Sequence, residues 1–295
     1  MSLKRRGDAF HPVLVLLLAV GAPAGPTSTI ALRDTVEHEY RDSVRRRGTD
    51  PECFERFFAA MAAGRSDGLF FAGDLGQRIF QQPFSWKALG LDVRGRSFTL
   101  RINYRTSHQI RSQADRLLGP EVSDVDGNVE SRKGTISVFN GPEPIICGYA
   151  NAETENQAVG AWLKQCNSSG VLPQEIGVFV RSESELSRAQ AAVKAAGLQG
   201  RVLGKDMVTE EGFVSISTMH LAKGMEFRVV AVMACDDEII PSQMRIDTAA
   251  DEAELTEIYN TERQLLYVAC TRARDQLHVS AVKPESEFLG DLLQK

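Results

Sequence analysis

Residues 214–232 read VSISTMHLAKGMEFRVVAV, and this stretch decides the fold that we expect for the chain. Apolar segments rich in β-branched residues, at 213–218 and 228–234, have the composition of buried strands. Between them the sequence predicts a short helical turn that closes at Gly224. Strands that are apolar throughout are typical of a parallel sheet buried on both faces.

The same pattern continues on both sides of this stretch. Alternating strands and helices predict an α/β fold, a parallel sheet with helices on both faces. The Gly-, Ser- and Asp-rich segment 119–134 is predicted to be a linker or a long loop. Further strands are expected at 69–72, 135–139, 144–149, 175–180 and 276–282, helices at 51–63, 153–166, 183–196 and 257–271, and a strand followed by a helix within 97–118.

The composition indicates an ordinary globular protein. The 295 residues are 43% hydrophobic and 25% charged, with a formal net charge of -5, and the length suits one large or two modest α/β domains. Because the chain is not basic overall, nucleic-acid binding would need a local groove of basic and aromatic side chains. The five cysteines are far apart and form no CxxC pair. They indicate neither a zinc site nor a disulfide framework, and we predict a reducing, cytoplasmic location.

The N-terminal segment carries a conflicting signal. Basic residues at 4–6 precede an apolar run at 13–20 and small residues at 22–24, a pattern that resembles a short secretory signal. The alternative is a buried strand followed by a Gly/Pro turn. The apolar run is too short to span a bilayer, so no membrane partner is expected.

The turn within 214–232 concentrates polar side chains between two buried strands. His220, Lys223 and Glu226 lie three residues apart, so the spacing predicts that they share one polar face. A single histidine in such a place is more often structural. Its combination with Thr218 at the preceding strand end favours a functional site.

A second polar loop, GDLGQRIF at 73–80, follows the apolar strand LFFA at 69–72. Ligands of parallel sheets bind beyond the carboxyl ends of the strands, where this loop begins. Gln77 could orient a water molecule or bond a phosphate oxygen without adding charge. The alternative is an ordinary turn with a polar cap.

Two further stretches contain arginines with two readings each. In LRINYRTS, at 100–107, Arg105 could hold a phosphate while Tyr104 stacks on a base, or it is a surface arginine beside a partly buried tyrosine. In TERQLLYVACTRAR, at 261–274, Arg272 is either stabilised by a helix C-terminus or neutralises the charge of a transferring phosphoryl group.

Together and in this order, the four stretches resemble motifs III to VI of the UvrD/Rep-like superfamily 1 DNA helicases. The resemblance covers residues 69–118 and 172–282. It implies a second RecA-like domain at 131–295, preceded by a remnant of a first RecA-like domain at 51–130. It also implies ATP-driven translocation on DNA and unwinding with 3′-to-5′ polarity. The extra domain that UvrD-type enzymes often insert is expected to be absent or minimal, because nearly all residues between 110 and 215 are needed for the core.

The resemblance also implies a role for each nucleotide-binding side chain. Three of them act on the γ-phosphate of ATP, which Gln77 senses and which Arg105 and Arg272 contact. The others belong to the nucleoside side of the site: Tyr104 stacks on the adenine, Glu226 bonds the ribose, and Gly224 lies in the same loop.

For single-stranded DNA, the resemblance implies stacking platforms and a polar path. Phe80 and Trp86 are the expected platforms, with Phe84 as the alternative to Trp86, because the residues between Phe80 and Trp86 separate the two further than the family pattern does. The path is expected to be lined by Thr218, His220 and Lys223.

Two parts of the family's ATPase site are missing from the sequence. That site needs a P-loop lysine on the phosphates and an Asp-Glu pair that holds Mg²⁺ and the attacking water. The segment GAPAGPTST at 21–29 resembles a damaged P-loop in which Pro26 stands where the lysine is expected. The glycines at 200 and 204 are one residue too close for a P-loop. ATP and Mg²⁺ are thus the expected cofactors, but the protein ligands of the metal are absent.

The acidic pair is replaced by RRRGTD at 45–50. Codons for Arg-Arg-Arg-Gly-Thr, read one base later, can encode Val-Asp-Glu-Ala, which is what the family carries there. We therefore hypothesise that residues 1–50 are an irregular leader that is partly a frame-shifted translation. The nucleotide sequence of the gene tests this hypothesis.

Three functions are compatible with these observations. The first is a helicase fragment that binds ATP and single-stranded DNA but does not hydrolyse ATP alone. The second is a non-catalytic module that binds single-stranded DNA or a protein. The third is one half of a split ATPase, whose P-loop lysine is supplied by a separate chain.

Overall fold

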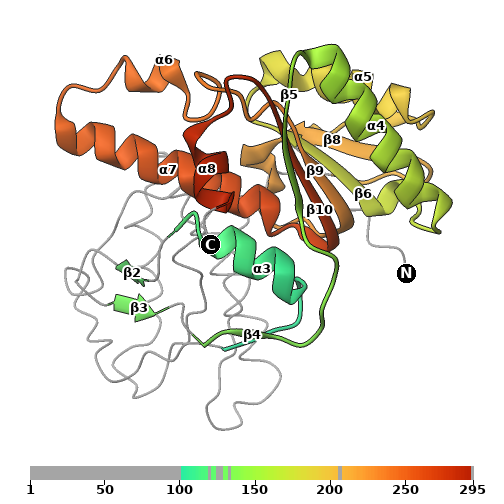
Figure 1. The fold of residues 1–295 in the computed structure, drawn as a ribbon, viewed down its shortest axis with the longest axis horizontal. Coiled ribbons are helices and arrows are strands. Elements are labelled where there is room, and N and C mark those ends of the chain that lie inside the picture. Colours follow the sequence, from blue (N-terminus) through green and yellow to red (C-terminus); the bar gives the residue numbers. More distant parts are fainter. Residues whose placement is uncertain (1–100, 119–120, 124–128, 132–133, 205–207, 294–295) are drawn as a thin grey trace, which may run out of the picture.

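The computed structural model describes residues 101–118, 121–123, 129–131, 134–204 and 208–293 (Figure 1). The expectations for the leader at 1–50, for the helix at 51–63, for the strand at 69–72 and for residues up to 100 lie outside these residues. So do Gln77, Phe80, Phe84 and Trp86.

A six-stranded parallel sheet forms the centre of the described structure (Figure 1). Every pair of neighbouring strands in it runs parallel, which confirms the expected α/β fold. In spatial order the strands are β5 (Ile145–Tyr149), β10 (Ala273–Val282), β9 (Phe227–Val232), β6 (Ile176–Val180), β8 (Val214–Thr218) and β7 (Gly200–Val202).

Helices cover both faces of this sheet, as the sequence predicts (Figure 1). Alternate residues of β6 point to opposite faces, so Phe179 belongs to one hydrophobic cluster whereas Val178 and Val180 belong to the other. One face is covered by α4 (Ala152–Ser168) and α5 (Leu186–Ala195), and the other by α3 (His108–Asp115), α7 (Glu252–Cys270) and α8 (Glu287–Leu293).

Short elements make the connections between these strands and helices. Three of them are 3-10 turns: η2 (Pro173–Glu175), η3 (Glu183–Glu185) and η4 (Met219–Ala222). The turn η4 connects β8 to β9 and is the short helical turn that the sequence predicts. No helix among the described residues is long and apolar enough to cross a membrane.

Several short elements differ from the sequence-based expectations. The strand expected at 135–139 is only β4 (Ile136–Ser137), which pairs with β1 (Ile102–Asn103) in a separate two-stranded sheet. The expected linker at 119–134 contains an antiparallel pair, β2 (Glu121–Ser123) with β3 (Val129–Ser131). The elements β7, α6 (Gln243–Ile246) and α8 were not expected. They have three, four and seven residues, too few to show a period.

A β-bulge in β10 frees a backbone carbonyl group that binds a neighbouring segment. Ala273 pairs with Phe227 and Gln276 pairs with Val229, so β10 has one more residue than β9 over this interval. Such a bulge takes backbone groups out of the ladder. Here the carbonyl oxygen of Arg274 accepts a hydrogen bond from the backbone N–H of Ser107, at 3.0 Å.

Candidate functional site

Three of the four sequence motifs meet at the amino-terminal edge of the sheet, where β9 and β10 begin. The backbone N–H of Phe227 donates to the carbonyl of Arg272 at 3.0 Å, and that of Ser107 donates to Arg274 at the same distance. These bonds hold the segments around residues 103–107, 224–227 and 271–274 together. The structure thus brings together the described part of the predicted nucleotide site.

The tip of the first segment is shaped by Asn103. Its side-chain oxygen accepts hydrogen bonds from the backbone N–H groups of Arg105 and Thr106, at 2.9 and 3.4 Å, and its amide donates to the Ser137 hydroxyl at 3.3 Å. This is the local turn that Asn side chains favour. It presents Tyr104 to solvent with 71% of its surface exposed. The sequence-based prediction did not include Asn103, although Asn is a frequent turn residue.

Arg105 and Glu226 form an ion pair that joins two motifs 121 residues apart in sequence. The Nε–Oε2 distance is 3.2 Å, and the side chains are 44% and 48% exposed. Such exposed pairs contribute about 0–1 kcal/mol to stability. Both groups can therefore exchange partners at little cost, which a ligand-binding pair requires.

The connection between β8 and β9 runs from one edge of the sheet to the other. Gly224 has φ +89°, a conformation that side chains rarely adopt, so this position favours glycine. The helical turn ends at Ala222, and Lys223 has extended angles of −62° and 128°. The expectation that His220, Lys223 and Glu226 share one helical face is therefore wrong, because a helical period needs helical backbone throughout.

Arg272 lies immediately beyond α7, and its side chain is turned inward and buried. Its Nε donates to the carbonyl of Val268 at 3.0 Å, and its two terminal nitrogens donate to the carbonyl of Met225 and to the Thr271 hydroxyl, both at 3.4 Å. A cation at the carbonyl end of a helix is stabilised by the helix dipole. The contacts expected for that reading are thus present in this conformation.

A second cluster of charges lies at the opposite, carboxyl-terminal edge of the sheet. Glu262 of α7 is fully buried, and both of its oxygens accept bonds from Arg181, which directly follows β6, at 2.6 Å each. Arg245 of α6 donates to Glu262 Oε1 at 2.8 Å. The sequence-based reading missed these three residues, although a Glu and an Arg within apolar segments were a signal for buried pairing.

Thr218 and His220, two of the predicted DNA-contacting residues, lie half-buried at this carboxyl-terminal edge. Burial lowers the pKa of His220, and the neighbouring cations of Arg181 and Arg245 lower it further, whereas Glu262 opposes them. The imidazole is therefore neutral near pH 7. A neutral histidine can still donate to or accept from a nucleic acid.

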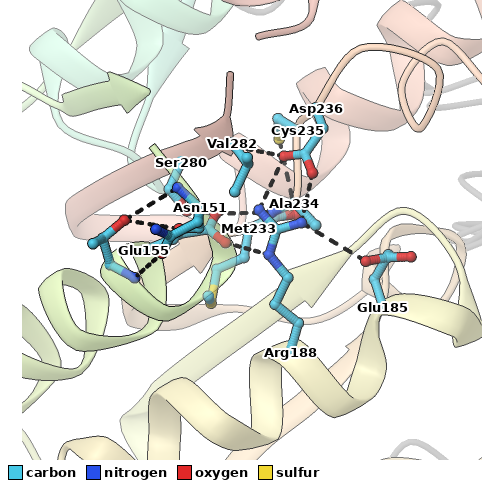
Figure 2. Close-up of polar contacts among 11 residues, drawn as sticks. Asn151, Glu155, Glu185, Arg188, Met233, Ala234, Cys235, Asp236, Ser280 and Val282 are labelled. Carbon is cyan, nitrogen blue, oxygen red and sulfur yellow. Dashed lines mark hydrogen bonds and ion pairs between the residues drawn. The ribbon is translucent and has the colours of Figure 1, made fainter. Parts of the chain in front are cut away.

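A third polar network fixes the loop that follows β9 (Figure 2). Arg188 of α5 donates to both oxygens of Asp236, at 2.6 and 3.0 Å, and also to Glu155. The fully buried Glu155 accepts from the Ser280 hydroxyl at 2.6 Å and from the backbone N–H of Ala234 at 3.2 Å. Ala234 has a positive φ of 57°, so the network holds this loop in an uncommon conformation.

The described residues do not provide a metal site. No group of three or more His, Cys, Asp or Glu side chains in the described part of the chain could hold a metal ion.

Comparison with known proteins gives this geometry a family context. Residues 202–284 match the family model of the UvrD-like helicase C-terminal domain. The ATP-dependent DNA helicase UvrD1 of Mycobacterium leprae is 40% identical over 92 residues, which cover 28% of this chain and 11% of the relative. UvrD1 of Mycobacterium tuberculosis is 38% identical over 95 residues (28% and 11%), and the ATP-dependent DNA helicase PcrA of Bacillus subtilis is 33% identical over 100 residues (30% and 12%).

The chain spans only about an eighth of the length of these curated relatives. Among solved structures, the C-terminal domain of a possible DNA helicase from Lactobacillus plantarum WCFS1 is similar, with 23% sequence identity and a TM-score of 0.45. That alignment covers 64% of this chain and 94% of the solved chain.

The match at 202–284 contains β8, the η4 turn, β9, α7 and all of β10, and therefore the motifs at 214–227 and 261–274. The expected resemblance is confirmed for this part of the chain. Residues 202–284 are thus similar to the UvrD-like helicase C-terminal domain and to parts of the UvrD1 and PcrA DNA helicases.

Proposed function

We propose that this chain is the C-terminal part of an ATP-dependent DNA helicase or translocase, that it binds ATP and single-stranded DNA, and that it does not hydrolyse ATP alone. The observation that carries this proposal is the exposed ion pair between Arg105 and Glu226. It brings a phosphate-binding cation and a ribose-binding carboxylate to one place from distant parts of the sequence. The relatives named above are ATP-dependent DNA helicases.

In the proposed complex, the exposed Tyr104 stacks on the adenine, and Glu226 accepts a hydrogen bond from the ribose. Arg105 leaves Glu226 and turns to the γ-phosphate, whose negative charge attracts its guanidinium. Arg272 can join it only by giving up its bonds to the carbonyls of Val268 and Met225. Gln77, outside the described residues, is proposed to sense the same phosphate.

The proposed lack of turnover follows from the residues that arginine fingers need around them. Phosphoryl transfer depends on holding the phosphates and positioning the attacking water, and arginines act on a phosphate that is already held. The 295-residue sequence contains no GxxxxGK[ST] motif.

The domain division stays a prediction. It comprises a leader at 1–50, a first-domain remnant at 51–130 and a second domain at 131–295. The cytoplasmic location is a prediction as well.

A binding assay with a fluorescent ATP analogue and the full chain tests the nucleotide site. Tyr104→Ala is expected to weaken binding at least about fivefold, because one stacking contact with a base contributes about 1–3 kcal/mol. Tyr104→Phe keeps the ring and is the matched control, with affinity close to that of the unchanged chain. Equal affinities for all three proteins would refute the assigned role of Tyr104.

An ATPase assay, with and without single-stranded DNA, tests the second half of the proposal. We expect no turnover above background. Robust turnover by the purified chain would overturn this expectation. Turnover only after addition of a chain that carries a P-loop would favour the split ATPase, and DNA binding without any nucleotide binding would favour the non-catalytic module.

A further inference from the structure

One group of charged side chains at the carboxyl-terminal edge of the sheet contains more cations than carboxylates. Arg181 and Arg245 share one carboxylate, that of Glu262. Two guanidinium groups and one carboxylate leave a formal charge of one positive unit. Because His220 is neutral near pH 7, it does not change this sum.

The two arginines differ in how much of their hydrogen-bonding capacity is used. Arg181 is buried and binds both oxygens of Glu262, so its planar group is matched by the carboxylate. Arg245 reaches Oε1 of Glu262 with one nitrogen only, and its side chain is 40% exposed. A guanidinium has five N–H donors in a fixed fork. The excess charge and most of the unused donors are therefore those of Arg245.

Arg245 is also held in place from its backbone side. It lies on the short helix α6 (Figure 1). This helix ends the loop that the Arg188–Asp236 pair holds in place. Within this loop the backbone N–H of Gln243 donates to the carbonyl of Glu238 at 2.9 Å. A cation that is fixed both at its backbone and at its tip loses little entropy when it binds an anion.

The nearest predicted function of this edge is nucleic-acid binding. His220 lies close enough to Arg245, Arg181 and Glu262 for their charges to act on it, and Thr218 precedes it by two residues. Acidic residues follow on the same connection, and they are engaged locally: Asp247 accepts from the Gln243 amide and Asp251 caps α7. The partly exposed Arg245 therefore lies beside the expected DNA path, close to the acidic start of α7.

We propose that Arg245 contacts a backbone phosphate of the single-stranded DNA that follows Thr218 and His220, and that Glu262 is the residue that positions it. This inference rests on the DNA binding proposed above. A guanidinium fork matches the oxygens of a phosphodiester and can bind two of them at once. An acidic protein segment offers similar charge. Single-stranded DNA would in addition follow the surface of Thr218 and His220 while one of its phosphates binds Arg245.

Fluorescence anisotropy with a labelled oligo-dT, measured over a series of salt concentrations, tests this proposal on the full chain. Arg245→Gln keeps the Arg181–Glu262 pair and is expected to fold. It should lower the affinity about three- to tenfold and reduce the slope of log affinity against log salt by about 0.7, the value for one phosphate contact on a single strand. Arg245→Lys should restore the slope and part of the affinity. Arg201→Gln is the matched control. Arg201 lies on the edge strand β7, is exposed and has one carboxylate partner, Glu210.

Each outcome decides between stated alternatives. If the unchanged chain binds oligo-dT but Arg245→Gln has the same affinity and slope, the inference is wrong and the proposed function stands. If the unchanged chain does not bind oligo-dT, both are wrong. An equal loss in Arg201→Gln would also overturn the inference, since it would indicate general charge attraction. A poly-glutamate peptide that binds the unchanged chain and not Arg245→Gln, while the DNA slope is unaffected, would assign the residue to an acidic protein partner instead.

Discussion

The two edges of the central sheet use charge in opposite ways. At the amino-terminal edge, Arg105 and Glu226 pair in the open, each with nearly half of its side chain exposed. At the carboxyl-terminal edge, Glu155 and Glu262 are fully buried, and each is bound by arginine. Water screens the Arg105–Glu226 pair, but it is excluded from the carboxylates of Glu155 and Glu262.

This difference separates residues that are available for ligands from residues that hold the fold. An exposed pair loses little when a ligand replaces one partner. A buried carboxylate that loses its arginine keeps its desolvation cost without the attraction that offset it. We therefore expect substitutions of the exposed pair at the amino-terminal edge to alter binding, and substitutions of the buried carboxylates at the carboxyl-terminal edge to alter stability first.

The largest expected effect is at Glu262. Glu262→Ala should lower the free energy of unfolding by about 3–5 kcal/mol, because it leaves the buried Arg181 guanidinium without a counter-charge. Urea unfolding followed by circular dichroism measures this loss. The double variant Arg181→Met, Glu262→Leu should recover most of it, since apolar side chains of similar size need no counter-charge. A loss below about 1 kcal/mol in Glu262→Ala would mean that this edge behaves like an exposed surface.

A smaller effect, which depends on pH, is expected at His278 of β10, between the two edges. Burial lowers the pKa of His278 to about 4, from 6.5. Its Nε2 lies 3.3 Å from the Tyr149 hydroxyl, and its Nδ1 has no hydrogen-bond partner in the described structure. Between these pH values the unfolded chain takes up a proton that the folded chain does not, so stability falls as the pH falls from 6.5 to 4. The contribution is about 3 kcal/mol in total.

The variant His278→Phe isolates this contribution. Its free energy of unfolding, measured in urea between pH 7.5 and pH 4.5, should decline less steeply than that of the unchanged chain. Parallel curves for the two proteins would show that the histidine has the same pKa in the folded and unfolded states, and that other groups cause the acid sensitivity.

The smallest effect on stability is expected at the amino-terminal edge. Arg105→Ala, Glu226→Ala and the double variant should each change the free energy of unfolding by less than about 1 kcal/mol, because the pair is exposed. The same variants should weaken the binding of a fluorescent ATP analogue. A loss of stability as large as that of Glu262→Ala would remove the distinction between the two edges.

The strands of the six-stranded sheet and the helices that cover it could mostly be predicted from local sequence. The segments expected at 144–149, 175–180, 213–218 and 228–234 contain the observed strands β5, β6, β8 and β9. The apolar composition of β6, β8 and β9 reflects burial on both faces, whereas β5 is an edge strand whose residues are partly or fully exposed. The three-residue strand β7 was missed because all of its residues are exposed and carry no apolar pattern.

The motifs predicted which segments lie together, but not which groups each side chain contacts. The quoted strings placed Tyr104, Arg105, Gly224 and Glu226 in one nucleotide site, and the structure brings these residues to the same edge of the sheet. The strings did not show that Arg272 turns inward, or that Arg181 and Arg245 share Glu262. Their functional roles remain predictions that the assays above test.

The sequence alone determined the α/β class, the similarity of residues 202–284 to the UvrD-like helicase C-terminal domain and the absence of a P-loop lysine from the 295 residues, because each depends on local composition or on short strings. Only the tertiary structure decided which charges meet. The strand order β5-β10-β9-β6-β8-β7 sends the connection at 219–226 from the carboxyl-terminal to the amino-terminal edge of the sheet. His220 and Glu226 are only six residues apart in sequence, yet they lie at opposite edges of the sheet. Arg105 and Glu226 are 121 residues apart in sequence, yet they form an ion pair. Burial then determines which charged side chains keep their partners within the protein and which are accessible to a ligand.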